Sequence, residues 1–366
     1  MKYYFIAGER SGDLHGGNLI KSLKSIDEQA IIKGFGGDYM TDAGADLSVH
    51  YRDLAFMGFW EVIKNLRTIK GFFKQSKAEI NAFNPDAVVL IDYAGFNLKI
   101  AKYAKGKGIP VYYYISPKVW AWNQKRALKI KDRVSRMFVI MPFEKDFYQK
   151  YDWEVDYVGN PVLDAINDHE PTATNINISE YIAILPGSRR QELQHVLPVL
   201  GGLVKQFPDQ KFAVAAVDNL AEDLYDPIKD NPNVTLFYSH TYDLLAHARA
   251  AIVTSGTATL ETALWEVPQI VIYRTSGFSY HIAKRLIKVP YISLVNLIAD
   301  REVVKELIQD EFTVQKLSYE LNKILNEAAY RKEMIQSYRD LKEQLNIGRA
   351  SDNAASLMVA HLRSRQ

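Results

Sequence analysis

The stretch that decides the fold is Tyr181-Ile182-Ala183-Ile184-Leu185-Pro186-Gly187-Ser188-Arg189. Its first five residues form an uninterrupted apolar and aromatic run, which is typical of a strand buried on both faces of a parallel sheet. The spacing of Leu193, Val196 and Leu197 predicts that a helix follows the turn. A buried strand, a short glycine-containing turn and a helix are the repeating unit of a doubly wound α/β fold.

The same pattern recurs along both halves of the chain. Buried strands are predicted at residues 3–7, 31–37, 87–91, 111–115 and 137–140, and then at 181–185, 211–217, 234–238, 250–253 and 269–273. A polar segment at residues 167–178 separates the two sets and is interpreted as the interdomain linker. We therefore predict two Rossmann-like α/β domains that face a cleft, with ligands at the carboxyl ends of the strands.

The predicted boundaries are an N-terminal domain at residues 1–165 and a C-terminal domain at residues 178–345. Residues from 301 to the end are predicted to be helical and charged. A helix at residues 346–366 either stays with the second domain or returns to the first, and the sequence leaves both arrangements open.

Composition narrows the class of protein. The 366 residues include 45 basic and 43 acidic side chains, and the net charge of +2 argues against a nucleic-acid binder. The chain has no cysteine, which excludes disulfides and thiolate metal sites and agrees with a cytoplasmic setting. No signal-peptide pattern and no run of about 18 apolar residues is visible, so any membrane contact is expected to be peripheral. No cluster of metal ligands stands out, and we predict neither a metal nor a cofactor.

Two turns in the second half are candidates for binding an anion. Leu185–Arg189 and Ser255–Thr257 each follow a predicted buried strand and open a helix. Glycine allows close backbone approach, helix N-termini present unpaired N–H groups, and an arginine adds a planar charged fork. Either turn alone could be an ordinary strand-to-helix connection, but two in one domain favour a diphosphate. The residues concerned are Gly187, Ser188, Arg189, Ser255, Gly256 and Thr257.

Glu261 lies about one helical turn beyond the second glycine turn, where a carboxylate accepts hydrogen bonds from both hydroxyls of a ribose. The alternative is an acid that stabilises the helix dipole. In the first half, the turn Gly8–Asp13 lacks the spacing of the dinucleotide fingerprint. We therefore expect a nucleotide diphosphate in the second half, and a nicotinamide dehydrogenase is not indicated.

Acidic side chains at strand ends of the first half are candidates for chemistry. Asp92 directly follows a predicted buried strand, where an environment of low polarity raises a carboxyl pKa towards that of a useful base. Glu9 and Asp13 flank the first turn, and Asp13 fits a helix N-cap better than Asp92 does. His15 stands alone on the first helix, which favours a structural role. The segment Ser116–Trp122, with two tryptophans, suits a sugar or acyl pocket or an interdomain core.

A helical pattern from about Gly58 to Phe83 combines large apolar side chains with a basic face. Such a helix lies in a membrane interface or, more commonly, packs on a sheet. The density of aromatic residues near its start favours lipid contact. The expected contact residues are Phe56, Met57, Phe59, Trp60, Ile63 and Arg67.

Motifs spread over nearly the whole chain point to a known family. They are Gly8–Asp13, Met57-Gly58 with Glu61-Val62, Ile91-Asp92 with Phe96-Asn97, Ser116-Pro117 with Val119–Trp122 and Gln124–Arg126, Pro142–Glu144, Leu185–Arg189, Ser255–Ala258 with Leu260-Glu261, Tyr273-Arg274, Ala283–Leu286 and Asn296-Leu297. With these residues the chain resembles the lipid-A-disaccharide synthases, bacterial glycosyltransferases of the GT-B type. Several of the motifs are weak alone, but their combination in this order is specific.

The resemblance implies a reaction and its partners. A UDP-linked 2,3-diacylglucosamine donates its sugar to the 6-hydroxyl of 2,3-diacylglucosamine 1-phosphate. The products are a β-1,6 disaccharide and UDP, and the configuration at the transferred carbon inverts. The expected location is the cytoplasmic face of the inner membrane of a Gram-negative-type bacterium, with the membrane surface as a partner and no nucleic acid. The oligomeric state stays open.

The resemblance also implies roles for single residues. Asp92 is the leading candidate for the catalytic base, and Glu9 and Asp13 stand on the same side of the reaction. The expected acceptor-binding residues are Ser11, Gly12, Ser116, Trp120, Gln124 and Arg126. On the donor side, the two glycine turns are expected to stabilise the leaving UDP and Glu261 to hold the ribose. Tyr273 and Asn296 complete this donor set.

The chain departs from its relatives at two places. Some relatives have Pro-Asp where this chain has Ala94-Gly95, which weakens the case for an acid there as the base. Many relatives differ at Arg190, to which we give no role. The competing interpretations are another GT-B enzyme, such as a UDP-N-acetylglucosamine 2-epimerase or a cell-wall glycosyltransferase, and a nucleotide-sugar binding module without catalysis. The aromatic basic helix argues against the first, and the acids at strand ends argue against the second.

Overall fold

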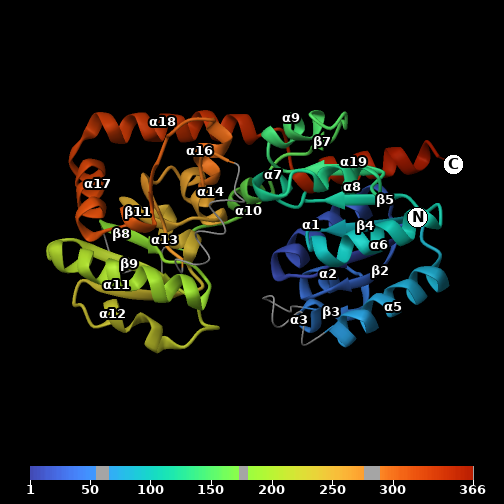
Figure 1. Cartoon of the computed structure of the whole chain (residues 1–366), viewed down its shortest axis with the longest axis horizontal. Helices are drawn as coiled ribbons and strands as arrows, with labels where there is room; N and C mark the ends of the chain where they lie inside the picture. The colour runs from blue at the N-terminus through green and yellow to red at the C-terminus, as the bar shows by residue number, and fades with distance from the viewer. Residues whose placement is uncertain (55–65, 173–179, 276–288, 366) are drawn as a thin grey trace. The chain divides into compact units, whose positions relative to one another are not determined.

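The computed structural model describes residues 1–54, 66–172, 180–275 and 289–365, which form two compact units (Figure 1). Unit 1 comprises Met1–Pro161 and Asn346–Gln366, and unit 2 comprises Val162–Leu345. Each unit is a parallel sheet covered by helices, so the prediction of two Rossmann-like α/β domains is confirmed. Because 346–366 belong to unit 1, the chain ends in the unit in which it begins.

Unit 1 contains a seven-stranded parallel sheet in the order β3-β2-β1-β4-β5-β6-β7. The strands are β1 (Lys2–Ala7), β2 (Ile31–Gly36), β3 (Asp46–His50), β4 (Ala87–Ile91), β5 (Val111–Tyr114), β6 (Arg136–Val139) and β7 (Asp156–Tyr157). The sequence pattern missed β3 and β7, which lie at the two edges of the sheet. An edge strand contacts one neighbour only and needs no continuous apolar run, so its signal in the sequence is weak.

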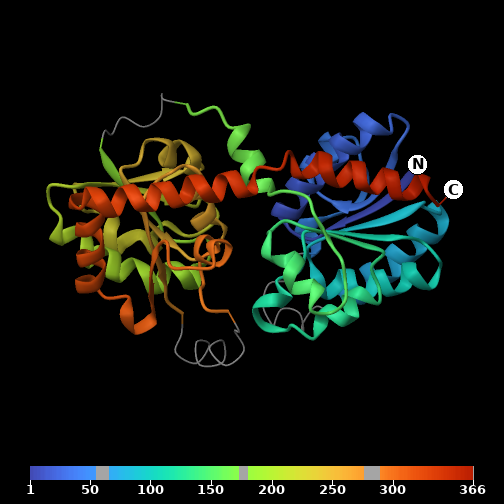
Figure 2. The same ribbon diagram turned by 90° about the horizontal axis from the view of Figure 1, so that it is seen from above.

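Helices cover both faces of this sheet. They are α1 (Arg10–Ile26), α2 (Asp38–Asp42), α3 (Tyr51–Leu54), α5 (Leu66–Phe83), α6 (Ala94–Gly106), α7 (Val119–Trp122), α8 (Arg126–Lys131), α9 (Phe143–Gln149) and α19 (Ala350–Arg363). Helix α19 packs against α1, and Figure 2 shows it running along unit 1. Its Met358 and Val359 join Phe5 and Leu23 in one buried apolar cluster, which ties the end of the chain to the first strand.

Unit 2 contains a six-stranded parallel sheet in the order β10-β9-β8-β11-β12-β13. The strands are β8 (Tyr181–Leu185), β9 (Lys211–Ala216), β10 (Val234–Tyr238), β11 (Ala250–Thr254), β12 (Gln269–Tyr273) and β13 (Lys305–Ile308). The prediction that residues after 301 are wholly helical is wrong, because β13 pairs with β12 at the edge of the sheet. Its sequence, Lys305-Glu306-Leu307-Ile308, is half charged and gives no apolar run.

The helices of unit 2 follow the same alternation. They are α10 (Pro161–Asn167), α11 (Arg190–Gln206), α12 (Asp226–Lys229), α13 (Thr241–His247), α14 (Thr257–Leu264), α16 (Leu294–Ala299), α17 (Val314–Asn326) and α18 (Ala328–Leu345), with 3-10 turns η2 (Glu222–Tyr225) and η3 (Gln309–Glu311). Helix α10 begins at the last residue of the first part of unit 1. Since all paired strands are parallel, their carboxyl ends meet at one edge of each sheet.

Candidate active site

The carboxyl ends of β1 and β4 bring two acidic residues of unit 1 together. Ala7 pairs with Ile91 at the ends of these neighbouring strands, and Glu9 and Asp92 stand in the loops that follow. The negative charge of Glu9 acts on Asp92 and raises its pKa, which shows that the two carboxyls are near each other. Glu9 is exposed and Asp92 is half-buried, so both are open to a ligand from the same edge of the sheet.

The turn that carries Asp92 has a strained backbone. Asp92 and Tyr93 have φ angles of 42° and 45°, a left-handed conformation that side chains other than glycine rarely adopt. The side-chain amide of Asn97 donates to the carbonyls of Ile91 (3.1 Å) and Asp92 (2.9 Å). The hydroxyl of Tyr113 also donates to the Asp92 carbonyl. These buried donors hold the turn, and with it the direction of the Asp92 side chain.

The environment of Asp92 favours a basic carboxylate. Burial raises its pKa first, and the charge of Glu9 raises it further. The positive charge of Lys118 and a hydrogen bond from the Tyr93 amide act in the opposite direction. A carboxylate with a raised pKa is a stronger base than an exposed one.

Asp13 has a different part in the structure from the one that the sequence suggested. Its side chain is fully buried. One oxygen accepts from the amides of Gly37 (2.7 Å) and Met40 (3.1 Å), and the other accepts from Tyr39 (3.1 Å). These amides lie at the start of α2, so the carboxylate caps a neighbouring helix rather than its own. Because three backbone N–H groups depend on it, the Asp13 carboxylate stabilises the start of α2.

In the segment after β5, Ser116 and Trp120 are buried within unit 1. The hydroxyl of Ser116 lies 2.6 Å from that of Tyr148, and Trp120 packs edge-on against Phe143 with ring centroids 5.0 Å apart. Both residues are buried. The Gln124 amide donates to the Trp120 carbonyl at 3.0 Å. The open side chains of this segment include Lys118 and Trp122, the latter 47% exposed. Gly12 is buried on α1, Ser11 is exposed and Arg126 half-exposed.

In unit 2, the backbone amides of the turn after β8 donate hydrogen bonds to a carboxylate of the helix that follows. Glu192, on the first turn of α11, accepts hydrogen bonds from the amides of Ser188 (3.1 Å) and Arg189 (3.2 Å). It also pairs with the Arg189 guanidinium at 3.3 Å. The expectation of unpaired amides at this turn is therefore wrong for this state of the protein. The Glu192 carboxylate occupies the place that an anion would take, and Arg189 remains exposed.

The turn after β11 is open. Gly256 is the N-cap of α14, and the amides of Thr257 and Ala258 meet no acceptor among the residues that the structure describes. The Ser255 hydroxyl donates to the Ile292 carbonyl at 2.8 Å and so fixes the loop from behind. In an α-helix each N–H donates to the carbonyl four residues earlier, so the first N–H groups have no partner within the helix. The helix dipole adds a partial positive charge at the same end. This turn can hold one anionic group of a diphosphate.

Glu261 lies one turn into α14, half-buried beside Tyr242 of α13. Tyr242 is the polar side chain that acts on its carboxyl. Burial raises the pKa of Glu261 to about 7, and the Tyr242 hydrogen bond lowers it. The carboxyl is thus poised near neutrality, where ionisation makes it a strong acceptor. Sequence reasoning missed Tyr242, because the pairing joins two helices that are distant along the chain.

Two further donor-side candidates differ in their availability. Tyr273 is the last residue of β12. The charge of Glu192 raises its pKa and the charge of Arg189 lowers it, which indicates that Tyr273 lies near the turn after β8. Asn296 is fully buried. Its amide nitrogen donates to the Val304 carbonyl and to Glu306, both at 2.9 Å, and its oxygen accepts from the amides of Val303 and Val304. Every hydrogen-bonding position of this amide is used within the domain, so Asn296 organises a loop.

Comparisons with known proteins show the family of the chain. The family described as lipid-A-disaccharide synthetase matches residues 3–359. The chain is 38% identical over 367 residues to a lipid-A-disaccharide synthase of Syntrophus aciditrophicus, covering 97% of this chain and 96% of that protein. It is 37% identical over 368 residues to the corresponding protein of Coxiella burnetii, with 96% of each chain covered.

The chain belongs to the lipid-A-disaccharide synthase family. It is therefore an enzyme, a glycosyltransferase of lipid A biosynthesis. Among solved structures, a UDP-GlcNAc 2-epimerase from Neisseria meningitidis bound to UDP-GlcNAc matches with a TM-score of 0.66 over the whole of both chains, at 15% identity. The glycotransferase of kitacinnamycin matches with a TM-score of 0.68 over 99% of each chain, at 13% identity. These likenesses show the fold, and the GT-B prediction is confirmed.

The residues that the sequence pattern predicts to contact a membrane lie mostly outside the described residues. Phe56, Met57, Phe59, Trp60 and Ile63 fall in this class, whereas Arg67 is exposed on α5. Further along α5, Phe72 and Phe73 contact Phe35 and Phe96 at centroid distances of 6.4 and 6.0 Å. This part of the helix therefore packs on unit 1. In the described portion of the chain, no helix combines the length and apolarity needed to cross a membrane.

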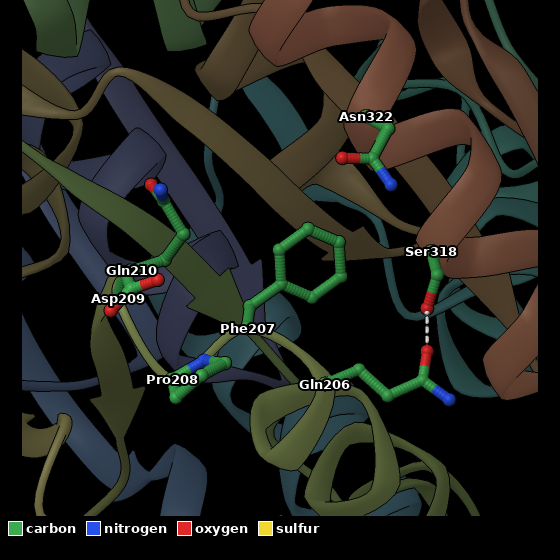
Figure 3. A pocket seen from close by; sticks show the side chains of 7 residues that line it. All are labelled: Gln206, Phe207, Pro208, Asp209, Gln210, Ser318 and Asn322. Carbon is green, nitrogen blue, oxygen red and sulfur yellow. Dashed lines mark hydrogen bonds between the residues drawn. The ribbon is translucent and has the colours of Figure 1, made fainter.

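A cavity of about 290 Å³ lies in unit 2, between the end of α11 and α17 (Figure 3). Gln206, at the end of α11, accepts a hydrogen bond of 2.6 Å from Ser318 of α17, and Asn322 lines the same cavity. The remaining lining residues are Phe207, Pro208, Asp209 and Gln210. They precede β9, so the cavity lies at the amino ends of the strands. The two glycine turns after β8 and β11 lie at the carboxyl ends, so the cavity is not part of the candidate active site.

Proposed function

We propose that the enzyme transfers 2,3-diacylglucosamine from UDP to the 6-hydroxyl of 2,3-diacylglucosamine 1-phosphate, giving the β-1,6 disaccharide and UDP. The observation that carries this proposal is Asp92, a half-buried carboxyl on a strained turn at the carboxyl end of β4. Such a group suits the removal of a proton from a sugar hydroxyl. Membership of the family supplies the class of donor and acceptor.

The proposed step is a single displacement with inversion. The Asp92 carboxylate takes the proton of the acceptor hydroxyl while its oxygen forms a bond to the anomeric carbon of the donor. The bond from that carbon to the UDP oxygen breaks on the opposite face, and the electron pair leaves with the diphosphate. Stabilising the departing charge then requires donors placed in advance, because they need no reorganisation during the reaction.

The donor side of the proposal rests on unit 2. The open amides of Thr257 and Ala258 bind one phosphate, and Arg189 binds the other after Glu192 releases it. Glu261 accepts from the ribose hydroxyls, with Tyr242 holding its carboxylate. Asp13 and Asn296 support this chemistry through the fold, since their polar atoms are occupied by backbone groups.

Product formation tests the proposal. The purified protein is incubated in detergent with both acylated substrates, and the tetraacyl disaccharide and UDP are measured in the same samples. UDP without disaccharide would indicate hydrolysis, and epimerisation of UDP-N-acetylglucosamine in a parallel sample that contains it would favour the epimerase alternative. Absence of disaccharide from folded protein that binds UDP would overturn the proposed reaction.

We also propose peripheral attachment to the cytoplasmic face of the inner membrane, because acylated substrates reside there. The segment that contains Phe59 and Trp60 is the proposed contact. Replacing Phe59 and Trp60 by serine is expected to reduce sedimentation with lipid vesicles. Ile31, which is 50% exposed at the start of β2, provides the control Ile31→Ser. Equal sedimentation of the double variant and the control would contradict the proposed membrane contact.

A further inference from the structure

Glu306 is a half-buried carboxylate in the edge strand β13, and the proposed reaction gives it no part. It stands opposite Val271 of β12. Its neighbours Lys305 and Leu307 line a pocket together with residues of α17. Because successive side chains of a strand point to opposite faces of the sheet, Glu306 points to the face away from α17.

On that face, the Glu306 carboxylate accepts hydrogen bonds from the segment that leads into α16. One oxygen accepts from the amide of Ile292 at 3.0 Å. The other oxygen accepts from the amide (2.9 Å) and the hydroxyl (2.7 Å) of Ser293 and from the side-chain amide of Asn296 (2.9 Å). Ser293 and Asn296 are fully buried. Since hydrogen bonds to a charged acceptor are stronger than those between neutral groups, Glu306 holds this segment in one arrangement.

Ile292 connects Glu306 to the open turn after β11. Its N–H donates to Glu306, and the carbonyl of the same residue accepts from the Ser255 hydroxyl at 2.8 Å. The amide of Ser255 in turn donates to the Ile272 carbonyl of β12 at 2.9 Å. Ser255 is therefore held both by the sheet and by the segment that Glu306 organises.

A second connection joins the same segment to Gly256. The amide of Leu294 donates to the Thr259 hydroxyl at 3.3 Å. That hydroxyl donates to the Gly256 carbonyl at 2.8 Å, and Thr259 is fully buried. Gly256 is the N-cap of α14, so this connection fixes the backbone from which the open amides of α14 project.

We propose that Glu306 is a positioning residue of the nucleotide site. It holds residues 292–296 so that Ser255 and Gly256 present the open amides of α14 to one phosphate of the donor. The proposal rests on the phosphate contact put forward above for this turn, and it requires no contact between Glu306 and the substrate. Donors that are fixed before binding favour affinity, because the ligand then has no loop to order.

Titrations with UDP and with uridine test this role, because only UDP carries the phosphates. In Glu306→Gln, an N–H group replaces one accepting oxygen, so part of the segment loses its acceptor. UDP is expected to bind about three- to tenfold more weakly, and uridine is expected to bind as before. Loss of a negative charge by itself favours an anion, so weaker UDP binding has the sign opposite to a charge effect. Unchanged or tighter UDP binding, or equal losses for UDP and uridine, would overturn the proposal.

Matched variants separate the connection from general effects on unit 2. Thr259→Val cuts the link to Gly256 and is expected to weaken UDP binding, which also covers the case that Glu306→Gln does not fold. Thr262→Val removes another fully buried hydroxyl of α14, one that donates to the Ala258 carbonyl within the helix, and is expected to keep the UDP affinity. Glu302→Gln removes the charge of an exposed carboxyl shortly before β13 and is not expected to weaken UDP binding. Equal losses in Thr259→Val and Thr262→Val would contradict the proposal.

Combined variants show whether Glu306 acts through the two connections, and the wild-type reaction keeps this proposal distinct from the proposed function. Once Ser255→Ala and Thr259→Val have cut both connections, Glu306→Gln is expected to weaken UDP binding no further, and additive losses would contradict the proposal. Disaccharide formation by the wild-type protein, with unchanged UDP affinity in Glu306→Gln, would overturn the positioning role alone. Weaker UDP binding in Glu306→Gln, without disaccharide from the wild-type protein, would overturn the proposed reaction and support the positioning role.

Discussion

The aromatic ring of Tyr93 lies directly against Gly8. A Cβ atom at position 8 would stand 2.3 Å from Cγ of Tyr93, well inside the contact distance of two carbon atoms. The Tyr93 hydroxyl donates to the Leu54 carbonyl at 3.0 Å, which fixes the far end of the ring. The residues next to this pair in sequence are Glu9 and Asp92. Packing of the ring on a bare backbone therefore brings the loops of the two acids together.

Substituting Gly8 by alanine is expected to impair both stability and turnover. The added methyl group displaces the Tyr93 ring and disturbs the left-handed turn, at a cost of about 1–3 kcal/mol. Thermal unfolding and product formation measure the two effects. Gly95→Ala is the control, since a Cβ there meets nothing within 4 Å on the exposed start of α6. If Gly8→Ala matched this control in both measurements, the packing would not matter for the site.

Asp92→Asn is expected to remove turnover and to leave UDP binding intact. General base catalysis typically contributes about 10²–10⁴-fold, and an amide cannot accept the proton. Disaccharide formation gives the first quantity, and calorimetric titration with UDP gives the second. Weakened UDP binding would instead assign Asp92 to the nucleotide side. With Asp92 unchanged, Glu9→Gln is expected to lower the pKa of Asp92 and to move the acid limb of kcat/KM to lower pH.

Arg189 and Glu192 are expected to affect UDP binding in opposite directions. Arg189→Ala removes a charge-assisted contact and should weaken binding by roughly tenfold or more. Glu192→Gln removes the negative charge that now holds the amides of Ser188 and Arg189, so UDP is expected to bind more tightly at low salt. Titrations at two salt concentrations measure both effects. Unchanged affinity in Arg189→Ala would refute the proposed clamp, and weaker binding in Glu192→Gln would show that the internal cap is needed in the bound state.

Nucleoside binding is expected to depend on pH through Glu261. The pKa of this carboxyl is raised to about 7, so the ionised acceptor is present above pH 7 and is lost as the pH falls through that value. Titration with uridine isolates the effect, because uridine carries no phosphate that gains a proton in this range. Tyr242→Phe removes the hydrogen bond that lowers the pKa and should move the midpoint to higher pH. Glu261→Gln should abolish the pH dependence; a dependence that survives this change would point to another group.

The strands at the centre of each sheet could be predicted because burial on both faces demands a continuous apolar run, as in β4 and β8. The edge strand β13 could not, since only one neighbour pairs with it and half of its residues are charged. In the candidate site, the sequence pattern was sufficient to identify Asp92 and Glu261 as candidates, because each is an acidic residue that follows a predicted buried strand. The sequence contains Glu9 and Tyr242, but it does not show that Glu9 acts on Asp92 or that Tyr242 acts on Glu261.

By itself, the sequence determined the two α/β domains, the family and the residues that open each strand-to-helix turn. These depend on local patterns of apolar, small and acidic residues. Tertiary structure alone decided that Asp13 caps α2, that Asn296 is fully used within unit 2, and that Glu192 occupies the amides of the first glycine turn. It also decided that Glu144 accepts hydrogen bonds from the amides of Ile140 and Met141. The physical reason is that a polar side chain acquires its role from the donors and acceptors that folding places beside it, and most of these are backbone groups that carry no mark in the sequence.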